Sequence, residues 1–137
     1  MLDLDDEVLE VTHQWVMKAE SDLKTAAHIL RLRVDCPTDA VCFHAQQCVE
    51  KYLKALLVLN GIEFSRTHQI SVLVALLPAQ VRPDLTVEEQ DRFTEYAVTT
   101  RYPGDYDPIP YEEAQQAVRI ARRLRNQVRR RLPEVLR

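Results

Sequence analysis

Apolar residues recur along most of this 137-residue chain with the period of an α-helix. In residues 7–33, Trp15, Ala19, Leu23, Ala26 and Leu30 follow one another at steps of three and four, which places them on one helical face. No segment alternates between apolar and polar residues with period two, so we expect no sheet. We predict five helices, over residues 7–33, 38–60, 67–77, 86–100 and 110–131.

Turn and cap residues mark the ends of these segments. Pro37 and Pro78 end the first and third helices, because a proline disfavours helical geometry in the residue before it. Gly61 suits the left-handed C-cap of the second helix, and Thr86 with Glu89 forms a capping box for the fourth. Long helices joined by short links predict an all-α, up-and-down bundle of four to five helices in a single domain spanning residues 1–137.

The second predicted helix is apolar over more than half of its circumference, which is typical of a central helix. Its remaining arc of about 120° carries a polar stripe, at about 100° per residue. The stripe holds His44, Gln47, Glu50, Lys51 and Lys54. Its imidazole, its amide and its two ammonium groups are donors that suit a phosphate or a carboxylate. The alternative is an ordinary solvated face on which Glu50 and Lys54 form an i,i+4 pair.

Composition excludes several classes of protein. Only two glycines occur, so a phosphate-binding Walker loop and a dinucleotide-binding fingerprint are excluded. The three cysteines are expected to be small buried hydrophobes rather than a disulfide framework, and a metal site built from His44 and Cys48 is disfavoured. No apolar run is long enough to span a membrane and the first residues are acidic, so we expect a cytosolic protein.

Charge is unevenly distributed along the chain. The net charge of −3 argues against a general nucleic-acid binder. Residues 119–137 nevertheless contain many arginines and a single acid, Glu134. The arginines are Arg119, Arg122, Arg123, Arg125, Arg129, Arg130, Arg131 and Arg137. This stretch is either a polyanion-binding edge or a solvated helix end, where cations complement the helix dipole.

The longest predicted irregular stretch, residues 101–109, contains Arg101 and Tyr102 with further aromatic and acidic residues. Loops on rigid scaffolds often carry function. Its tyrosines could equally pack on the bundle, with the prolines only ending helices.

Several of these strings resemble the HEPN domain family over about residues 10–130. They are Phe43-His44-x-Gln46-Gln47-x-x-Glu50-Lys51-x-x-Lys54-Ala55-Leu56-Leu57, then Thr67-His68, then Arg101-Tyr102-Pro103, and the opening Trp15-x-x-x-Ala19-x-x-Asp22-Leu23-x-x-Ala26. The resemblance implies a five-helix bundle that pairs as a homodimer. It also implies a minimal nucleotidyltransferase as partner, in a pair like a toxin–antitoxin module.

Other members of the family are metal-independent ribonucleases in which four to six residues separate an arginine from the histidine that follows it. This chain departs from that pattern, because Tyr106, Asp107 and Pro108 stand where the histidine would follow Arg101. A side chain that exchanges a proton near neutral pH is therefore missing at that place. The sequence favours a non-catalytic protein with no catalytic residues, no metal and no cofactor.

The hypothesis from the sequence is a nucleotide- or phosphate-binding HEPN module. Its candidate ligand-binding residues are Arg101, Tyr102, His44, Gln47, Lys51, Lys54 and His68. Arginine suits bidentate phosphate contact and tyrosine suits stacking on a base. A ribonuclease toxin with an altered site and a homodimeric protein-binding scaffold remain alternatives, and contact with RNA is left open.

Overall fold

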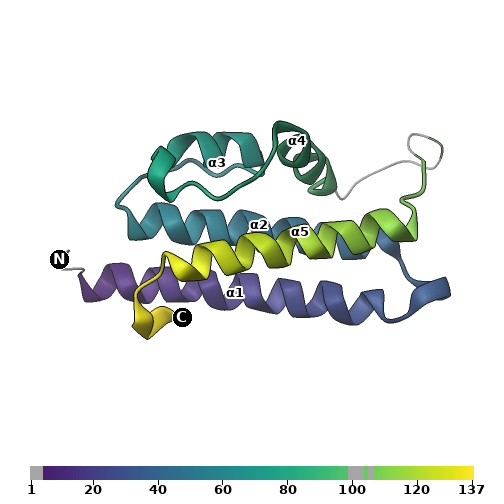
Figure 1. The fold of residues 1–137 in the computed structure, drawn as a ribbon, viewed down its shortest axis with the longest axis horizontal. Helices are drawn as coiled ribbons and strands as arrows, with labels where there is room; N and C mark the ends of the chain where they lie inside the picture. The colour runs from purple at the N-terminus through teal and green to yellow at the C-terminus, as the bar shows by residue number, and fades with distance from the viewer. Residues whose placement is uncertain (1–4, 99–103, 105–106) are drawn as a thin grey trace.

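The computed structural model is an all-helical bundle in which three long helices lie side by side (Figure 1). It describes residues 5–98, 104 and 107–137. The long helices are α1 (Asp6–Leu30), α2 (Thr38–Leu59) and α5 (Tyr111–Arg130). The shorter α3 (Ile70–Leu76) and α4 (Val87–Tyr96) form a second layer over them. The described residues contain no strand, which confirms the predicted all-α class.

Three short 3₁₀ turns complete the chain path. They are η1 (Arg33–Asp35) after α1, η2 (Ala79–Val81) after α3 and η3 (Glu134–Leu136) after α5. None of the described helices is long and apolar enough to cross a membrane.

The predicted helix ends agree with the structure to within a few residues. α3 begins at Ile70, three residues later than predicted, because the hydroxyl of Thr67 accepts the Gln69 N–H at 3.1 Å and holds that segment in a turn. α4 begins directly after Thr86, whose side chain and that of Glu89 form the reciprocal bonds of the predicted capping box. α4 ends at Tyr96, earlier than predicted.

Gly61 ends α2 in the left-handed conformation, as predicted, with φ of 69°. The Ile62 N–H donates to the Leu57 carbonyl at 2.9 Å and the Gly61 N–H donates to that of Val58 at 3.0 Å. This is the Schellman pattern, which satisfies two carbonyls at the helix end and turns the chain back along α2. The segment that follows, residues 62–68, therefore lies beside the C-terminal half of the helix that it has just left.

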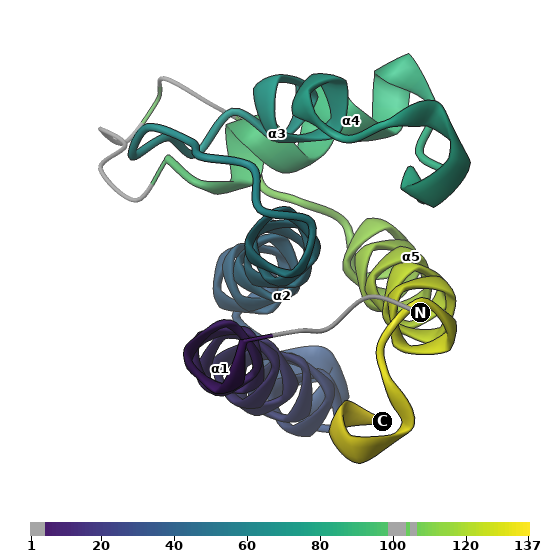
Figure 2. The same ribbon diagram turned by 90° about the vertical axis from the view of Figure 1, so that its left-hand side faces the viewer.

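α2 is the central helix of the bundle, as its wide apolar face predicts. Viewed end-on in Figure 2, it lies between α1 on one side and the α3–α4 layer on the other, with α5 beside it. Its apolar residues Val49, Leu53, Leu56 and Leu57 are fully buried. The apolar stripe of α5 is buried as well; it consists of Ala114, Ala117, Ala121, Leu124 and Val128. The core therefore surrounds α2, and polar groups of α2 are drawn into the bundle with it.

Candidate functional site

A hydrogen-bonded network centred on Glu50 lies on the polar face of α2. Glu50 is 3% exposed, and its carboxylate accepts hydrogen bonds from three neighbours. Gln46 Nε2 donates to Oε1 at 3.0 Å, His68 Nδ1 lies 2.8 Å from the same oxygen, and Lys54 Nζ donates to Oε2 at 3.0 Å. Gln47 Nε2 in turn donates to Gln46 Oε1 at 2.7 Å. We call these five residues the Glu50 cluster.

The Glu50 cluster keeps its central carboxylate ionised. Burial by itself raises the pKa of Glu50, but hydrogen bonds from Gln46, His68 and Lys54 and the charge of Lys54 outweigh it. The pKa of Glu50 therefore lies below its ordinary value. The Glu50–Lys54 pair forms as an i,i+4 pair, yet Lys54 is only 7% exposed, so this part of the stripe is not an ordinary solvated face.

Two aromatic rings cover Lys54. Its ammonium lies 5.3 Å from the ring centroid of Trp15 on α1 and 5.9 Å from that of Phe64 in the segment after α2. The two rings meet edge to face, with centroids 6.4 Å apart. Cation–π contacts of this kind stabilise a desolvated ammonium. Lys54 is thus held between a carboxylate on one side and aromatic faces on the other.

A cavity of about 520 Å³ opens beside these rings. We call it the Trp15 cavity; its lining consists of Trp15, Lys54, Phe64, Arg66, Thr67 and His68. Arg66 is exposed and has no ion-pair partner among the residues that the structure describes. The cavity therefore combines apolar walls with a buried ammonium and an unpaired guanidinium, as small-molecule sites commonly do.

The larger hollow between η2, α4 and α5, about 630 Å³, is a weaker candidate. Its polar groups already bind one another: Arg123 donates to Glu89 at 2.8 Å, and the Gln127 side chain accepts the Asp84 N–H at 2.8 Å. It also has no aromatic wall. Size alone therefore does not make it the better site.

A second ionic group, the Asp22 cluster, lies nearer the start of α2. Asp22 on α1 accepts from His44 Nδ1 at 2.9 Å and from Lys51 Nζ at 2.5 Å. Asp22 is 12% exposed at its side chain, so the cluster is partly screened by water. It ties the polar face of α2 to α1.

The structure thus divides the predicted stripe between two clusters. Gln47, Lys54 and His68 come together around Glu50. His44 and Lys51 instead share Asp22, and neither lines the Trp15 cavity. Arg101 and Tyr102, the two candidates from the loop after α4, lie outside the described residues.

Sequence reasoning did not select the aromatic residues Trp15 and Phe64 or the carboxylate of Asp22 as site residues. Trp15 looked like one more apolar position on α1, and Phe64 and Arg66 stand between predicted helices without a pattern of their own. Asp22 appeared only as part of the family-like string. The available signal was chemical: the chain has a single tryptophan, and it is the one aromatic residue on a helix face of alanines and leucines.

Other candidate chemistry from the sequence has a structural account. Among the described residues no group of three or more His, Cys, Asp or Glu side chains could hold a metal ion. Cys42 and Cys48 are buried and free, as expected, whereas Cys36 in the turn after α1 is free but only half-buried. Burial raises the pKa of the Cys42 thiol to about 12.

Part of the arginine-rich stretch is also engaged in holding the bundle together. Arg125 Nε donates to Glu20 at 2.5 Å, and Arg129 lies 3.6 Å from the same carboxylate, which also accepts the Tyr52 hydroxyl. These contacts join α5 to α1 and α2. Arg122 and Arg130 are exposed.

Comparison with known proteins agrees with the all-helical architecture. The model of the HEPN domain matches residues 12–131, most of the chain. The chain belongs to the HEPN domain family. It is 33% identical over 100 residues to a Methanocaldococcus jannaschii protein named "Putative toxin MJ1304", covering 67% of this chain and 63% of that protein.

A solved structure shares the fold. The crystal structure of ST0689, described as an archaeal HEPN homologue, superposes with a TM-score of 0.68 at 25% identity. The match covers 88% of this chain and 96% of that one. The family resemblance of the sequence is therefore confirmed.

Proposed function

We propose that this chain is a nucleotide- or phosphate-ligand-binding HEPN module that acts with a minimal nucleotidyltransferase, as one half of a toxin–antitoxin-like pair. The observation that carries the proposal is the Glu50 cluster beside the Trp15 cavity. The buried, hydrogen-bonded carboxylate of Glu50 holds the Lys54 side chain in place at the cavity wall. A lysine fixed in this way loses less conformational entropy on binding a ligand than a flexible one does. Preorganised donors at a cavity are typical of a binding site.

Family membership supports the partner half of the proposal. The name of the M. jannaschii relative contains the word toxin, and the alignment covers less than two thirds of that protein. The minimal nucleotidyltransferase and the homodimer come from the resemblance of the sequence to the family. Light scattering measures the dimer, and co-purification with a co-expressed small nucleotidyltransferase measures the partner.

A ribonuclease toxin with an altered site is the second candidate, and the relative's name favours it. No histidine follows Arg101 at the spacing of the family's ribonuclease motif. His68 of the Glu50 cluster does not supply that motif either, because the arginine before it, Arg66, is separated from it by a single residue. A binding role is therefore the better supported of the two.

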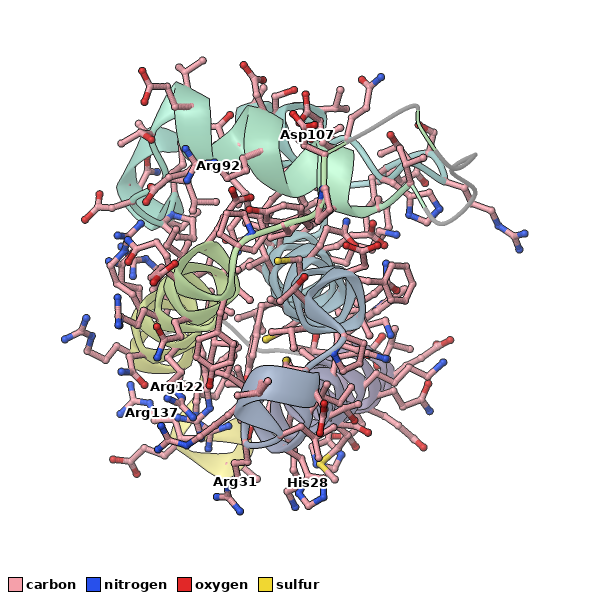
Figure 3. All side chains as sticks on the ribbon, turned by 90° about the vertical axis from the view of Figure 1, so that its right-hand side faces the viewer. His28, Arg31, Arg92, Asp107, Arg122 and Arg137 are labelled. Carbon is pink, nitrogen blue, oxygen red and sulfur yellow. The ribbon has the colours of Figure 1, made fainter. Side chains whose placement is uncertain are left out.

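The test measures binding and RNA cleavage side by side on the purified protein. Isothermal titration calorimetry uses AMP, UMP and inorganic phosphate, and a labelled RNA reports cleavage. We expect binding of a nucleotide and no cleavage, with Arg101→Ala weakening the binding. Arg31→Ala is the matched control, since Arg31 is an exposed arginine at the end of α1 (Figure 3).

Cleavage that Arg101→Ala abolishes would establish the ribonuclease instead. Silence in both assays would refute ligand binding and leave the protein-binding scaffold as the remaining class.

A further inference from the structure

The lining of the Trp15 cavity is aromatic in one part and cationic in another, and this difference favours one orientation of a bound ligand. One part of its lining is aromatic, from Trp15 and Phe64, which stand on different elements and meet edge to face. Another part carries the Lys54 ammonium, and Arg66 adds an exposed guanidinium. A volume of about 520 Å³ lies within the range of pockets that hold a ligand of drug size, about 300–1,000 Å³.

The Lys54 ammonium, in the buried part of the lining, is not an anion site. Lys54 Nζ lies 3.0 Å from Glu50 Oε2, so its charge is already compensated by an ionised carboxylate. A phosphate brought to the same ammonium would face that carboxylate at short range in a poorly solvated place, where like charges repel strongly. Lysine has three N–H donors, and Glu50 takes one of them. Lys54 is therefore suited to a neutral acceptor, such as a carbonyl oxygen or a ring nitrogen.

The exposed part of the lining has the opposite character. Arg66 is exposed and has no ion-pair partner in the described part of the chain. Its planar fork matches two phosphate oxygens at once. Thr67, next to it, accepts the Gln69 N–H and keeps its own hydroxyl hydrogen to donate. Water screens this region, so an anion there avoids the cost of burial.

We infer that the Trp15 cavity is the base-binding part of the nucleotide site, with the base on Trp15 and Phe64 beside Lys54 and the phosphate on Arg66. The inference rests on the proposed function and assigns its ligand class: a nucleoside monophosphate that enters base first. Base-first entry places the flat, uncharged ring between aromatic walls, beside the Lys54 ammonium whose charge Glu50 already compensates. The ring pair that binds the base is then Trp15 and Phe64 rather than Tyr102.

The single tryptophan makes this orientation directly measurable, because Trp15 is the only indole in the chain. Its fluorescence is followed during titration with AMP, UMP, adenosine and inorganic phosphate, with free N-acetyltryptophanamide correcting for absorbance. We expect both nucleotides and adenosine to change the Trp15 emission, and phosphate to leave it unchanged.

Two variants separate the two ends of the ligand. Loss of one stacking ring in Phe64→Ala is expected to weaken AMP and adenosine alike, by about tenfold. Arg66→Ala is expected to weaken AMP by about fivefold, as for an exposed ion pair, and to leave adenosine unchanged. Phe64→Leu, which keeps an apolar side chain but no ring, replaces Phe64→Ala if circular dichroism shows that the alanine variant does not fold.

The control variant Arg31→Ala removes the same charge at the far end of α1 (Figure 3). Arg31 follows Trp15 by sixteen positions, about 24 Å along a helix. We expect it to bind AMP and adenosine as the unmodified protein does.

The outcomes distinguish this inference from the proposed function. Heat of AMP binding without a change in Trp15 emission, and without an effect of the Phe64 variants, would overturn the base site and leave the proposed function standing. Phosphate that changes the emission and competes with AMP would overturn base-first entry. Absence of any nucleotide heat would overturn the proposed function, and the inference with it.

Discussion

The Glu50–Lys54 ion pair is the interaction whose removal best tests the buried character of the Glu50 cluster. The two charges lie 3.0 Å apart, and the residues are 3% and 7% exposed. At an effective dielectric constant of about 20 the gross attraction is about 5 kcal/mol, and desolvation of both groups offsets much of it. Removing one partner leaves the other charge buried, which in proteins costs about 3–5 kcal/mol.

Lys54 keeps its contacts with Trp15 and Phe64 when Glu50 is neutralised, so the lower end of that range applies. We expect Glu50→Gln and Lys54→Met each to lower the free energy of unfolding by about 3 kcal/mol. The double variant should cost less than the sum of the two by about 2 kcal/mol, because it removes both charges together. Urea denaturation followed by circular dichroism at pH 7 measures all four proteins. Coupling below about 0.5 kcal/mol, the range of a surface pair, would refute the reasoning.

The pH dependence of the same cycle has a definite sign. The pKa of Glu50 is lowered in the folded protein, so its ionised form contributes stability above the unfolded-state pKa of about 4.3. That contribution is lost as the pH falls through the lower, folded-state pKa. The destabilisation by Glu50→Gln should therefore be complete at pH 7 and shrink steadily below about pH 4. A penalty that stays constant down to the acid transition would show that charge is not the cause.

Three further predictions concern stability and thiol reactivity. Gly61→Ala should lower the free energy of unfolding, measured by thermal melting, by about 1 kcal/mol and Gly61→Asn by less. The cost is conformational, because φ is 69° and no atom lies within 4 Å of the added Cβ; equal stability of all three proteins would contradict the left-handed cap. Asp22→Asn should cost about 1 kcal/mol at low salt and less at high salt, since the Asp22 cluster is partly screened, and a salt-independent loss would argue against an ionic origin. At pH 8 a chromogenic disulfide reagent should label Cys36 first, and Cys42 and Cys48 only after unfolding. Burial raises the pKa of all three thiols, most strongly those of the buried Cys42 and Cys48, so rapid labelling of more than one thiol in the folded protein would contradict this prediction.

Local sequence signals sufficed for the elements of the fold. The capping box at Thr86 and the cap at Gly61 both formed as predicted, because each depends on residues within a few positions of one another. The start of α3 was predicted too early, since the Thr67 turn competes locally with helix formation.

The site was only partly predictable. The i,i+4 spacing of Glu50 and Lys54 foretold their pairing, because helix geometry alone brings them together. It did not foretell that the pair is buried, since burial depends on Trp15 from another helix and Phe64 from the following segment. Nor did a helical wheel separate His44 and Lys51 from Lys54, because the separation is caused by Asp22 on α1.

Consecutive residues were enough to establish the all-helical class, the central place of α2 and the family, since periodicity, caps and a long motif are local properties of the chain. Tertiary packing was needed to establish which polar groups of α2 meet a carboxylate, which meet aromatic rings and which line a cavity. The physical reason is that desolvation and electrostatic pairing act between side chains brought together from distant parts of the chain. One polar stripe thereby became two clusters with different surroundings, and a lysine that a wheel would assign to solvent became the buried donor of the Trp15 cavity.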